Sequence, residues 1–304
     1  MVGYREEPRI GEVFEEMSEA RPYYIEKHKI LPFEPRDRRD LNDPRGLLWC
    51  WEPPSNTANY IIACDPTVGI DGWRRVMRTA DDVKVDNAAI QVIKVGVIQD
   101  GKVVIPDVQV AEFAAPIDYY QCAEILNVIG RLYGGANEDG QALTIIEIYP
   151  GPGLMVQREL MSTWGYQNLY QQPYLDTRVP QLRRGSPYGW VASKQSVRDL
   201  WIKGLHHING KHIKINSPAL VEEMADCEPD DSRMAMKAVF GAHDDRIRAL
   251  LLALWAAHHW GNQIEWTPTD TQGPTQAPWQ ASAMSADEMF GAWETRLDEL
   301  LEEI

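Results

Sequence analysis

The 304-residue sequence lacks long hydrophobic runs, and its cysteines are few. No stretch reaches the roughly 18 apolar residues that a transmembrane helix needs, and the first residues, MVGYREEPRI, lack the apolar core of a signal peptide. We therefore expect a cytoplasmic protein with no membrane partner. The four cysteines are scattered and form no C-x-x-C pair, so reduced, buried thiols are expected rather than a zinc site or a redox dithiol.

Basic residues are also scarce, with 30 Lys and Arg against 45 Asp and Glu and a net charge of −15. A uniformly acidic surface would repel nucleic acids. The excess is uneven, however, because the last twenty residues, SADEMFGAWETRLDELLEEI, hold seven acids and one arginine. The rest of the chain is only mildly acidic, so charge alone does not exclude a DNA-binding surface there.

Composition divides the chain into four zones. Residues 1–58 mix charge and proline, which predicts a helix followed by a linker. Residues 59–261 alternate strand-like and helix-like patterns, as an α/β layer structure does. Residues 262–284 are rich in Thr, Pro and Gln and are expected to form a flexible linker. Residues 285–304 have apolar side chains at helical spacing, which predicts an acidic amphipathic tail that binds a partner.

The second zone begins with three apolar runs rich in β-branched residues, YIIACD, AAIQVIKVGVI and VVIPDVQVAEFA. They predict three consecutive antiparallel strands. A helix follows, with Asp118 as its N-cap and Gly134 as its stop. The pattern then predicts a strand in ALTIIEIY, a helix near 154–164, a short strand in NLYQQPY, a helix near 193–208 and a final apolar helix in HDDRIRALLLALWAAHHW.

Carboxylates occur where this pattern would place them beside one another. Asp65 ends the first apolar strand, Glu147 lies inside an apolar strand with no basic neighbour in sequence, and Asp244 and Asp245 begin the last helix directly after His243. A carboxylate in a central strand is costly unless it is paired or bound to metal. Hard oxygen ligands on separate elements suit two Mg²⁺ or Mn²⁺ ions, about 4 Å apart, that hydrolyse a phosphodiester.

Each of these residues also has a simpler explanation. Asp65 is suited to a turn, and acids such as Asp244 and Asp245 are stabilised by the free N–H groups at a helix start. His243, next to that start, is most simply a local structural feature, although it could orient a carboxylate. The joint occurrence of all the acids is what favours a metal site.

The order of these segments resembles the nuclease domain of the phage and viral terminase large subunit, which has a ribonuclease H-like fold. The resemblance covers roughly residues 47–260 and rests on YIIACDPTVG, on IIEIYPGPG followed by LMVQRELMSTWGYQNLY, on the Gly189-Trp190 turn leading through Ser193 into a helix, on HIKINSPALVEEM and on AHDDRIRALLLALW. No single motif is decisive, but five in this order are specific.

The resemblance implies an α/β fold with a ribonuclease H-like mixed β-sheet, its first three strands antiparallel, flanked by α-helices. It implies a metal-dependent endonuclease that cuts double-stranded, concatemeric phage DNA during packaging, in the cytoplasm of the infected host cell. Asp65, Glu147 and Asp245, with Asp244 beside it, would be the catalytic metal ligands. Which member of the adjacent pair binds metal directly stays open. The implied partners are the terminase ATPase motor, the portal protein and the small terminase subunit.

The chain departs from the family in having no G-x-x-x-x-G-K-[ST] motif and no space for a motor domain in its first 58 residues. The motor would belong to a larger subunit from which this nuclease derives, or to a separate polypeptide. A long segment that follows Asp65 carries Arg74, Arg75 and Arg78, which could pair with DNA phosphates.

A second basic group brackets the Gly189-Trp190 turn and could also localise DNA; its members are Arg183, Arg184, Lys194 and Arg198. Both basic groups have an ordinary alternative as solvated surface residues.

Two further readings compete with the terminase-like nuclease. One is another ribonuclease H-like DNA nuclease of the resolvase or transposase type, which shares the carboxylate chemistry. The other is a non-catalytic packaging or assembly module, in which the acidic tail docks on a portal or motor protein and the carboxylates are structural. A specific response to Mg²⁺ or Mn²⁺ would separate the enzymes from the module.

Overall fold

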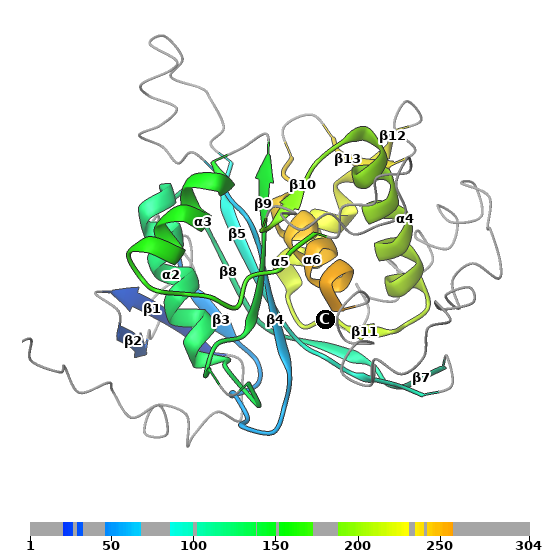
Figure 1. Ribbon diagram of the computed structural model, residues 1–304. Coiled ribbons are helices and arrows are strands. Elements are labelled where there is room, and N and C mark those ends of the chain that lie inside the picture. Colours follow the sequence, from blue (N-terminus) through cyan, green and yellow to red (C-terminus); the bar gives the residue numbers. More distant parts are fainter. Residues whose placement is uncertain are drawn as a thin grey trace, which may run out of the picture.

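The computed structural model describes residues 21–26, 29–32, 46–67, 86–99, 102–137, 139–149, 152–172, 188–230, 235–239 and 242–257. They form a mixed α/β fold in which helices cover both faces of a central sheet (Figure 1). None of the helices in these ranges is long and apolar enough to span a membrane. The predicted flexible linker and acidic tail lie outside the described residues.

The centre of the sheet follows the predicted strand order. Strand β4 (Tyr60–Asp65) pairs antiparallel with β5 (Ala88–Lys94), and β5 pairs antiparallel with β8 (Asp107–Ala115). On the other side of β4, β9 (Leu143–Tyr149) runs parallel to it, and the short β10 (Trp190–Val191) runs parallel to β9. The prediction of three consecutive antiparallel strands is therefore confirmed.

Residues 1–58 are predicted to form a helix and a linker; residues 1–20 of this zone lie outside the described residues, and the linker prediction is wrong where the structure describes the zone. Strands β1 (Arg21–Glu26), β2 (Lys29–Pro32) and β3 (Leu48–Cys50) extend the sheet, with β3 antiparallel to β8. Strand β3 pairs with N–H and C=O groups that β8 would otherwise expose along its edge, and β1 and β2 continue the sheet from β3. Three residues are too few for an alternating pattern to stand out in β3, although its two end side chains are buried.

Two of the predicted strands are split. Part of each forms a separate hairpin of β6 (Val97–Gln99) and β7 (Lys102–Ile105), and Pro106, which has no N–H for a ladder, separates β7 from β8. Within its described residues, 168–172, the predicted strand in NLYQQPY forms isolated bridges, such as Thr144 with Leu169. The remaining strands are β11 (Ile213–Lys214), which pairs with β8, and the hairpin of β12 (Cys227–Asp230) and β13 (Ala235–Ala238).

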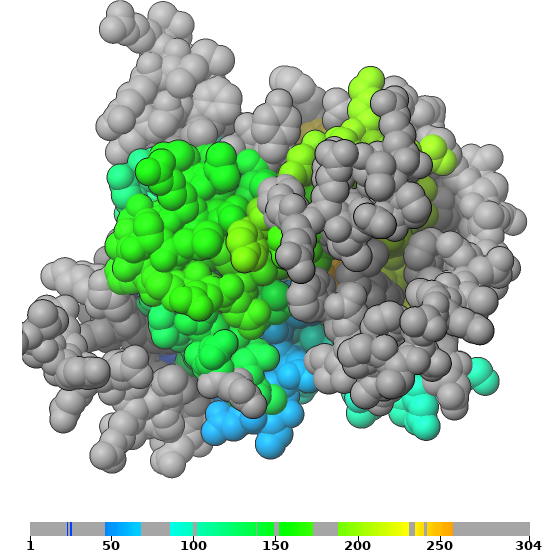
Figure 2. Space-filling view, viewed as in Figure 1, coloured from blue at the N-terminus to red at the C-terminus, as the bar shows by residue number. Residues whose placement is uncertain are grey.

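Helices α2 (Tyr119–Leu132) and α3 (Gly153–Ser162) cover one face of the sheet, and their side chains form a continuous green surface in Figure 2. As predicted, Asp118 caps α2; its side chain accepts a hydrogen bond of 2.9 Å from the backbone N–H of Gln121. The packed interior beneath includes three of the four free cysteines, Cys50, Cys64 and Cys122.

The opposite face is covered by α4 (Lys194–Asn209), α5 (Pro218–Ala225) and α6 (Asp245–Ala256). Ser193 caps α4, in line with the predicted start of that helix. Helix α6 is the most buried of the three, with an almost continuous apolar surface, and it packs against β4 and β5 (Figure 1). Its first turn consequently lies where the central strands end.

Candidate metal site

The two-residue alternation of the central strands turns Asp65 and Glu147 toward α6. In β4, Ile61 and Ala63 pack in the core on the α6 side, and Asp65 has the same parity. In β9, Ile145 packs on that side and Glu147 follows two residues later. Because β4 and β9 are adjacent and parallel, with Cys64 opposite Ile146, the two carboxylates lie at the same end of the sheet.

Close backbone packing around Glu147 depends on two glycines. A Cβ atom on Gly153, the first residue of α3, would lie 1.8 Å from the Glu147 carbonyl oxygen. Gly189 has φ of +88°, and a Cβ atom there would lie 2.5 Å from Ile148 Cγ2. The Gly189-Trp190 turn noted in the sequence therefore brings β10 directly beside Glu147, with Trp190 as its register partner.

Helix α6 supplies the other predicted acids. Asp245 is buried, and its Oδ2 atom accepts a hydrogen bond of 2.9 Å from the Asn87 backbone N–H. Asp244 is the N-cap residue but makes no capping hydrogen bond with its side chain. No side-chain hydrogen bond therefore supports the explanation of Asp244 as a helix cap.

Arg248 connects the strand acids to α6 and was not identified from the sequence. Its Nη2 atom donates to both carboxylate oxygens of Glu147 at 2.7 Å, and its Nε atom donates to Asp65 Oδ2 at 3.1 Å. The sequence offers Glu147 no basic neighbour, but the fold supplies one from 101 residues away. Arg248 follows Asp245 by three residues, which puts both side chains on one face of the helix, and this spacing could have identified Arg248 as a site residue.

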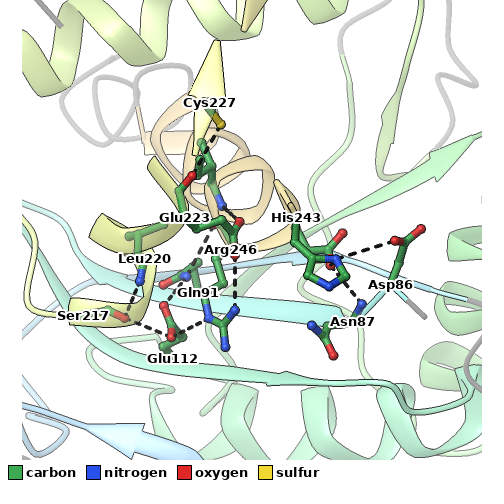
Figure 3. A network of polar contacts seen from close by, with 12 residues as sticks. Asp86, Asn87, Gln91, Glu112, Ser217, Leu220, Glu223, Cys227, His243 and Arg246 are labelled. Atoms are coloured by element: carbon green, nitrogen blue, oxygen red, sulfur yellow. Dashed lines mark hydrogen bonds and ion pairs between the residues drawn. The ribbon is translucent and has the colours of Figure 1, made fainter. Parts of the chain in front are cut away.

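Asp86 and His243 complete the acidic cluster beside Asp245. His243 Nδ1 lies 3.4 Å from Asp245 Oδ2 and 3.7 Å from Asp86 Oδ1 (Figure 3). One potential ligand atom from each of these three residues falls within 4.8 Å of the others, so they form a possible metal-binding group. The sequence allows His243 a role in orienting a carboxylate, whereas Asp86 follows a long segment without a motif and is not predicted as a site residue.

All four predicted ligands line one open cavity of about 260 Å³ at the end of the sheet. Its lining residues are Asp65, Pro66, Thr67, Asp86, Asn87, Glu147, Asp244, Asp245 and Arg248. The structure therefore brings together acids from β4, β9 and α6 that are distant in sequence, as predicted.

The acids in the cavity are poorly compensated. Burial raises the pKa of Asp65 well above its usual range; Arg248 opposes the shift, and the charges of Glu147 and Asp245 add to it. Burial also raises the pKa of Asp245 to about 7, although the hydrogen bond from Asn87 lowers it. Crowded acids of this kind would be stabilised by a divalent cation, and their carboxylate oxygens are the hard donors that Mg²⁺ and Mn²⁺ prefer.

A second polar network fixes the position of α6 behind the cavity (Figure 3). Arg246 donates from Nε to Glu112 Oε1 at 3.0 Å and from Nη1 to Glu223 Oε2 at 3.2 Å. Glu112 also accepts hydrogen bonds from Gln91 Nε2 at 2.8 Å and from Ser217 Oγ at 3.0 Å. These buried contacts join β5, β8 and α5 to the first turn of α6, which carries Asp245 and Arg248.

The predicted DNA-binding residues are not brought to the cavity within the described part of the chain. Lys194 is exposed and Arg198 half-buried on α4, and neither lines the cavity. The remaining five, Arg74, Arg75, Arg78, Arg183 and Arg184, lie outside the described residues.

The cavity presents five carboxylates, from β4, β9, the start of α6 and the residue Asp86 before β5, together with one guanidinium group. The imidazole of His243 lies next to Asp245. Such a set can hold divalent cations and position a phosphate ester beside them. Comparison with known proteins gives no independent assignment: no protein-family model matches the chain, and no curated protein matches its sequence.

Proposed function

We propose that the chain is a metal-dependent endonuclease that cleaves double-stranded DNA by two-metal-ion hydrolysis. The observation that carries the proposal is the convergence of Asp65, Glu147 and Asp245, from β4, β9 and α6, on one open cavity. Acids from distant segments repel one another when they meet at one site, and a bound divalent cation would offset that cost.

The architecture supports a ribonuclease H-like assignment. The central sheet has three antiparallel strands, β4, β5 and β8, and continues with β9 and β10 parallel to β4. This is the arrangement that the resemblance to terminase nuclease domains predicts for the first three strands. A carboxylate on β4, another on β9 and a third at the start of α6 match the positions that the resemblance assigns to metal ligands.

The residues of the cavity would have different roles in the reaction. Asp65, Glu147 and Asp245 would hold the cations, and the imidazole of His243 beside Asp245 would orient that carboxylate or join Asp86 as a ligand. Bound divalent cations would supply a water of lowered pKa and neutralise charge on the departing 3′ oxygen. Asp244, which lines the same cavity, is available as a further ligand.

The biological setting of the proposal follows the resemblance. The enzyme would cut concatemeric phage DNA during packaging in the infected cell, together with an ATPase motor, a portal protein and a small terminase subunit. The basic segment after Asp65, with Arg74, Arg75 and Arg78, would contact the DNA backbone.

One observation favours the alternative of a non-catalytic assembly module. Arg248 pairs with both Asp65 and Glu147, so these acids are not wholly uncompensated without metal. Against a purely structural role, the cavity stays open, and Asp244 makes no capping hydrogen bond from its side chain.

Cleavage of supercoiled plasmid tests the proposal. The purified chain is incubated with EDTA, Mg²⁺ or Mn²⁺, alongside Asp65→Asn, Glu147→Gln and the control Glu228→Gln, which alters an exposed acid on β12. We expect metal-dependent linearisation by the wild type and the control, and loss of at least about a hundredfold in rate in the two cavity variants. Circular dichroism would establish that each variant is folded.

Inertness of all forms, together with no binding of Mn²⁺, would overturn the nuclease and favour the assembly module. Comparable cleavage by Asp65→Asn would overturn the assignment of the site. A marked preference for four-way junctions over linear duplex would instead indicate the resolvase-type alternative.

A further inference from the structure

Arg248 occupies the position that a shared cation would need. Its guanidinium group donates to both Glu147 oxygens at 2.7 Å and to Asp65 Oδ2 at 3.1 Å. A divalent ion held by these same two carboxylates would approach their oxygens to about 2.0–2.6 Å. The guanidinium group and such an ion would therefore compete for Asp65 Oδ2 and for both Glu147 oxygens.

The single positive charge of the guanidinium group also balances only part of the negative charge around it. The residues that line the cavity include five carboxylates and one cationic side chain, that of Arg248. Arginine stays protonated at any working pH, so it can leave the carboxylates only by moving. Asp244 lines the same cavity and makes no capping hydrogen bond with its side chain, which leaves its carboxylate as an alternative partner for a displaced guanidinium group.

Resting on the metal-dependent function proposed above, we propose that Arg248 is an internal counter-ion that competes with the divalent metal for Asp65 and Glu147. Without metal, it prevents the two carboxylates from repelling each other. With metal, it must be displaced, and the energy of displacement lowers the metal affinity of the chain. The site would therefore fill only when divalent cation is plentiful or when a DNA phosphate offers Arg248 a new partner.

Measured metal affinity tests this competition directly. Mn²⁺ binding is followed by electron paramagnetic resonance, and Mg²⁺ binding by calorimetry, for wild type, Arg248→Gln, Arg248→Lys and the control Lys237→Gln. The control removes the same charge at a half-exposed position on β13. We expect Arg248→Gln to bind Mn²⁺ at least about tenfold more tightly than wild type, because a charge within contact distance of the ion is removed.

The Mn²⁺ affinity of Arg248→Lys should lie between those of wild type and Arg248→Gln, because lysine keeps the charge but lacks the planar guanidinium group that contacts both carboxylates. The control should match wild type. A second readout is thermal unfolding. In EDTA, Arg248→Gln should have a lower melting temperature than wild type, and addition of Mn²⁺ should raise its melting temperature by more than that of wild type.

If Arg248→Gln does not fold, wild-type protein still provides the test. The ¹H–¹⁵N resonance of the Arg248 Nε–H group, assigned by its absence in Arg248→Lys, should shift on saturation with Mg²⁺ as the group leaves Asp65. An unmoved resonance in the metal-saturated protein would overturn the proposal.

The outcomes distinguish this inference from the nuclease itself. Equal or weaker Mn²⁺ affinity in Arg248→Gln, with wild type still binding metal and cutting DNA, would overturn the competition alone. Absence of Mn²⁺ binding in both proteins, together with absence of cleavage, would overturn both proposals.

Discussion

Two arginines on α6, two residues apart, bind acids in two different settings. Arg246 joins Glu112 and Glu223 within a packed network, whereas Arg248 joins Asp65 and Glu147 at the wall of an open cavity. In both settings the acids are largely buried, with side chains between 3% and 16% exposed. Burial of charge alone therefore does not separate a structural site from a functional one.

The difference lies in how fully the acids are supplied with donors. Glu112 accepts hydrogen bonds from two glutamines and a serine as well as from Arg246, and Glu223 accepts one from the Ile247 backbone N–H. In the cavity, Arg248 donates hydrogen bonds to two carboxylates, and two more acids at the start of α6 line the same cavity. A deficit of positive charge beside open volume marks the place where a cation can bind.

The largest expected effect comes from breaking the packed network. Arg246→Met should lower the free energy of unfolding by roughly 3–5 kcal/mol, because it leaves Glu112 and Glu223 buried without their cation. Urea unfolding in EDTA measures the change. The matched control is Lys237→Met, which removes the exposed ion pair with Glu228 and should cost at most about 1 kcal/mol. A loss for Arg246→Met no larger than that of the control would contradict a structural role for the network.

The same comparison explains what the sequence could reveal about the site. Continuous apolar runs predicted β4 and β9, and the strand positions of Asp65 and Glu147 then followed, because side chains two residues apart share a face of a strand. Acids before an apolar helical run predicted the start of α6 in the same way. These are local patterns, which a single sequence records directly.

Partners from distant segments could not be predicted in this way. Arg248 meets Glu147 across 101 residues, and Asn87 meets Asp245 across 158, so no spacing rule links them. Asp86 precedes β5 without a motif of its own. The strands β1 to β3 were missed for a related reason: they are short strands whose formation depends on pairing, β3 with β8, β1 with β3 and β2 with β1, rather than on their own pattern.

A smaller effect should appear in the pH dependence of the metal-free protein. The pKa of Asp245 is raised from 3.8 to about 7, mainly by burial, so the folded state binds its proton more tightly than the unfolded state does. Stability in EDTA should therefore increase as the pH falls from above 7 toward 4, and the contribution of Asp245 is lost as the pH rises through about 7.

Asp245→Asn removes this ionisation and should stabilise the metal-free protein at pH 8 by about 1–2 kcal/mol. The variant should also show a shallower pH dependence than wild type, with a residual slope from Asp65, whose pKa is raised as well. Urea unfolding at several pH values between 5 and 8 measures both quantities. An Asn variant that is less stable than wild type at pH 8 would show that the ionised carboxylate contributes to the fold, as the acids of the packed network do.

The smallest expected change in stability concerns Asp244, and it separates the two explanations that the sequence left open. A side chain that caps a helix typically contributes about 0.5–2 kcal/mol, but that of Asp244 makes no capping hydrogen bond. Asp244→Ala should therefore change the free energy of unfolding in EDTA by less than about 0.5 kcal/mol. The control is Ser217→Ala at the N-cap of α5, where the Ser217 hydroxyl accepts from the Leu220 N–H and donates to Glu112, so a measurable loss is expected. If Asp244→Ala is stable yet binds Mn²⁺ more weakly than wild type, Asp244 is retained for the cation; if it is destabilised as much as Ser217→Ala, its place at the start of α6 is structural.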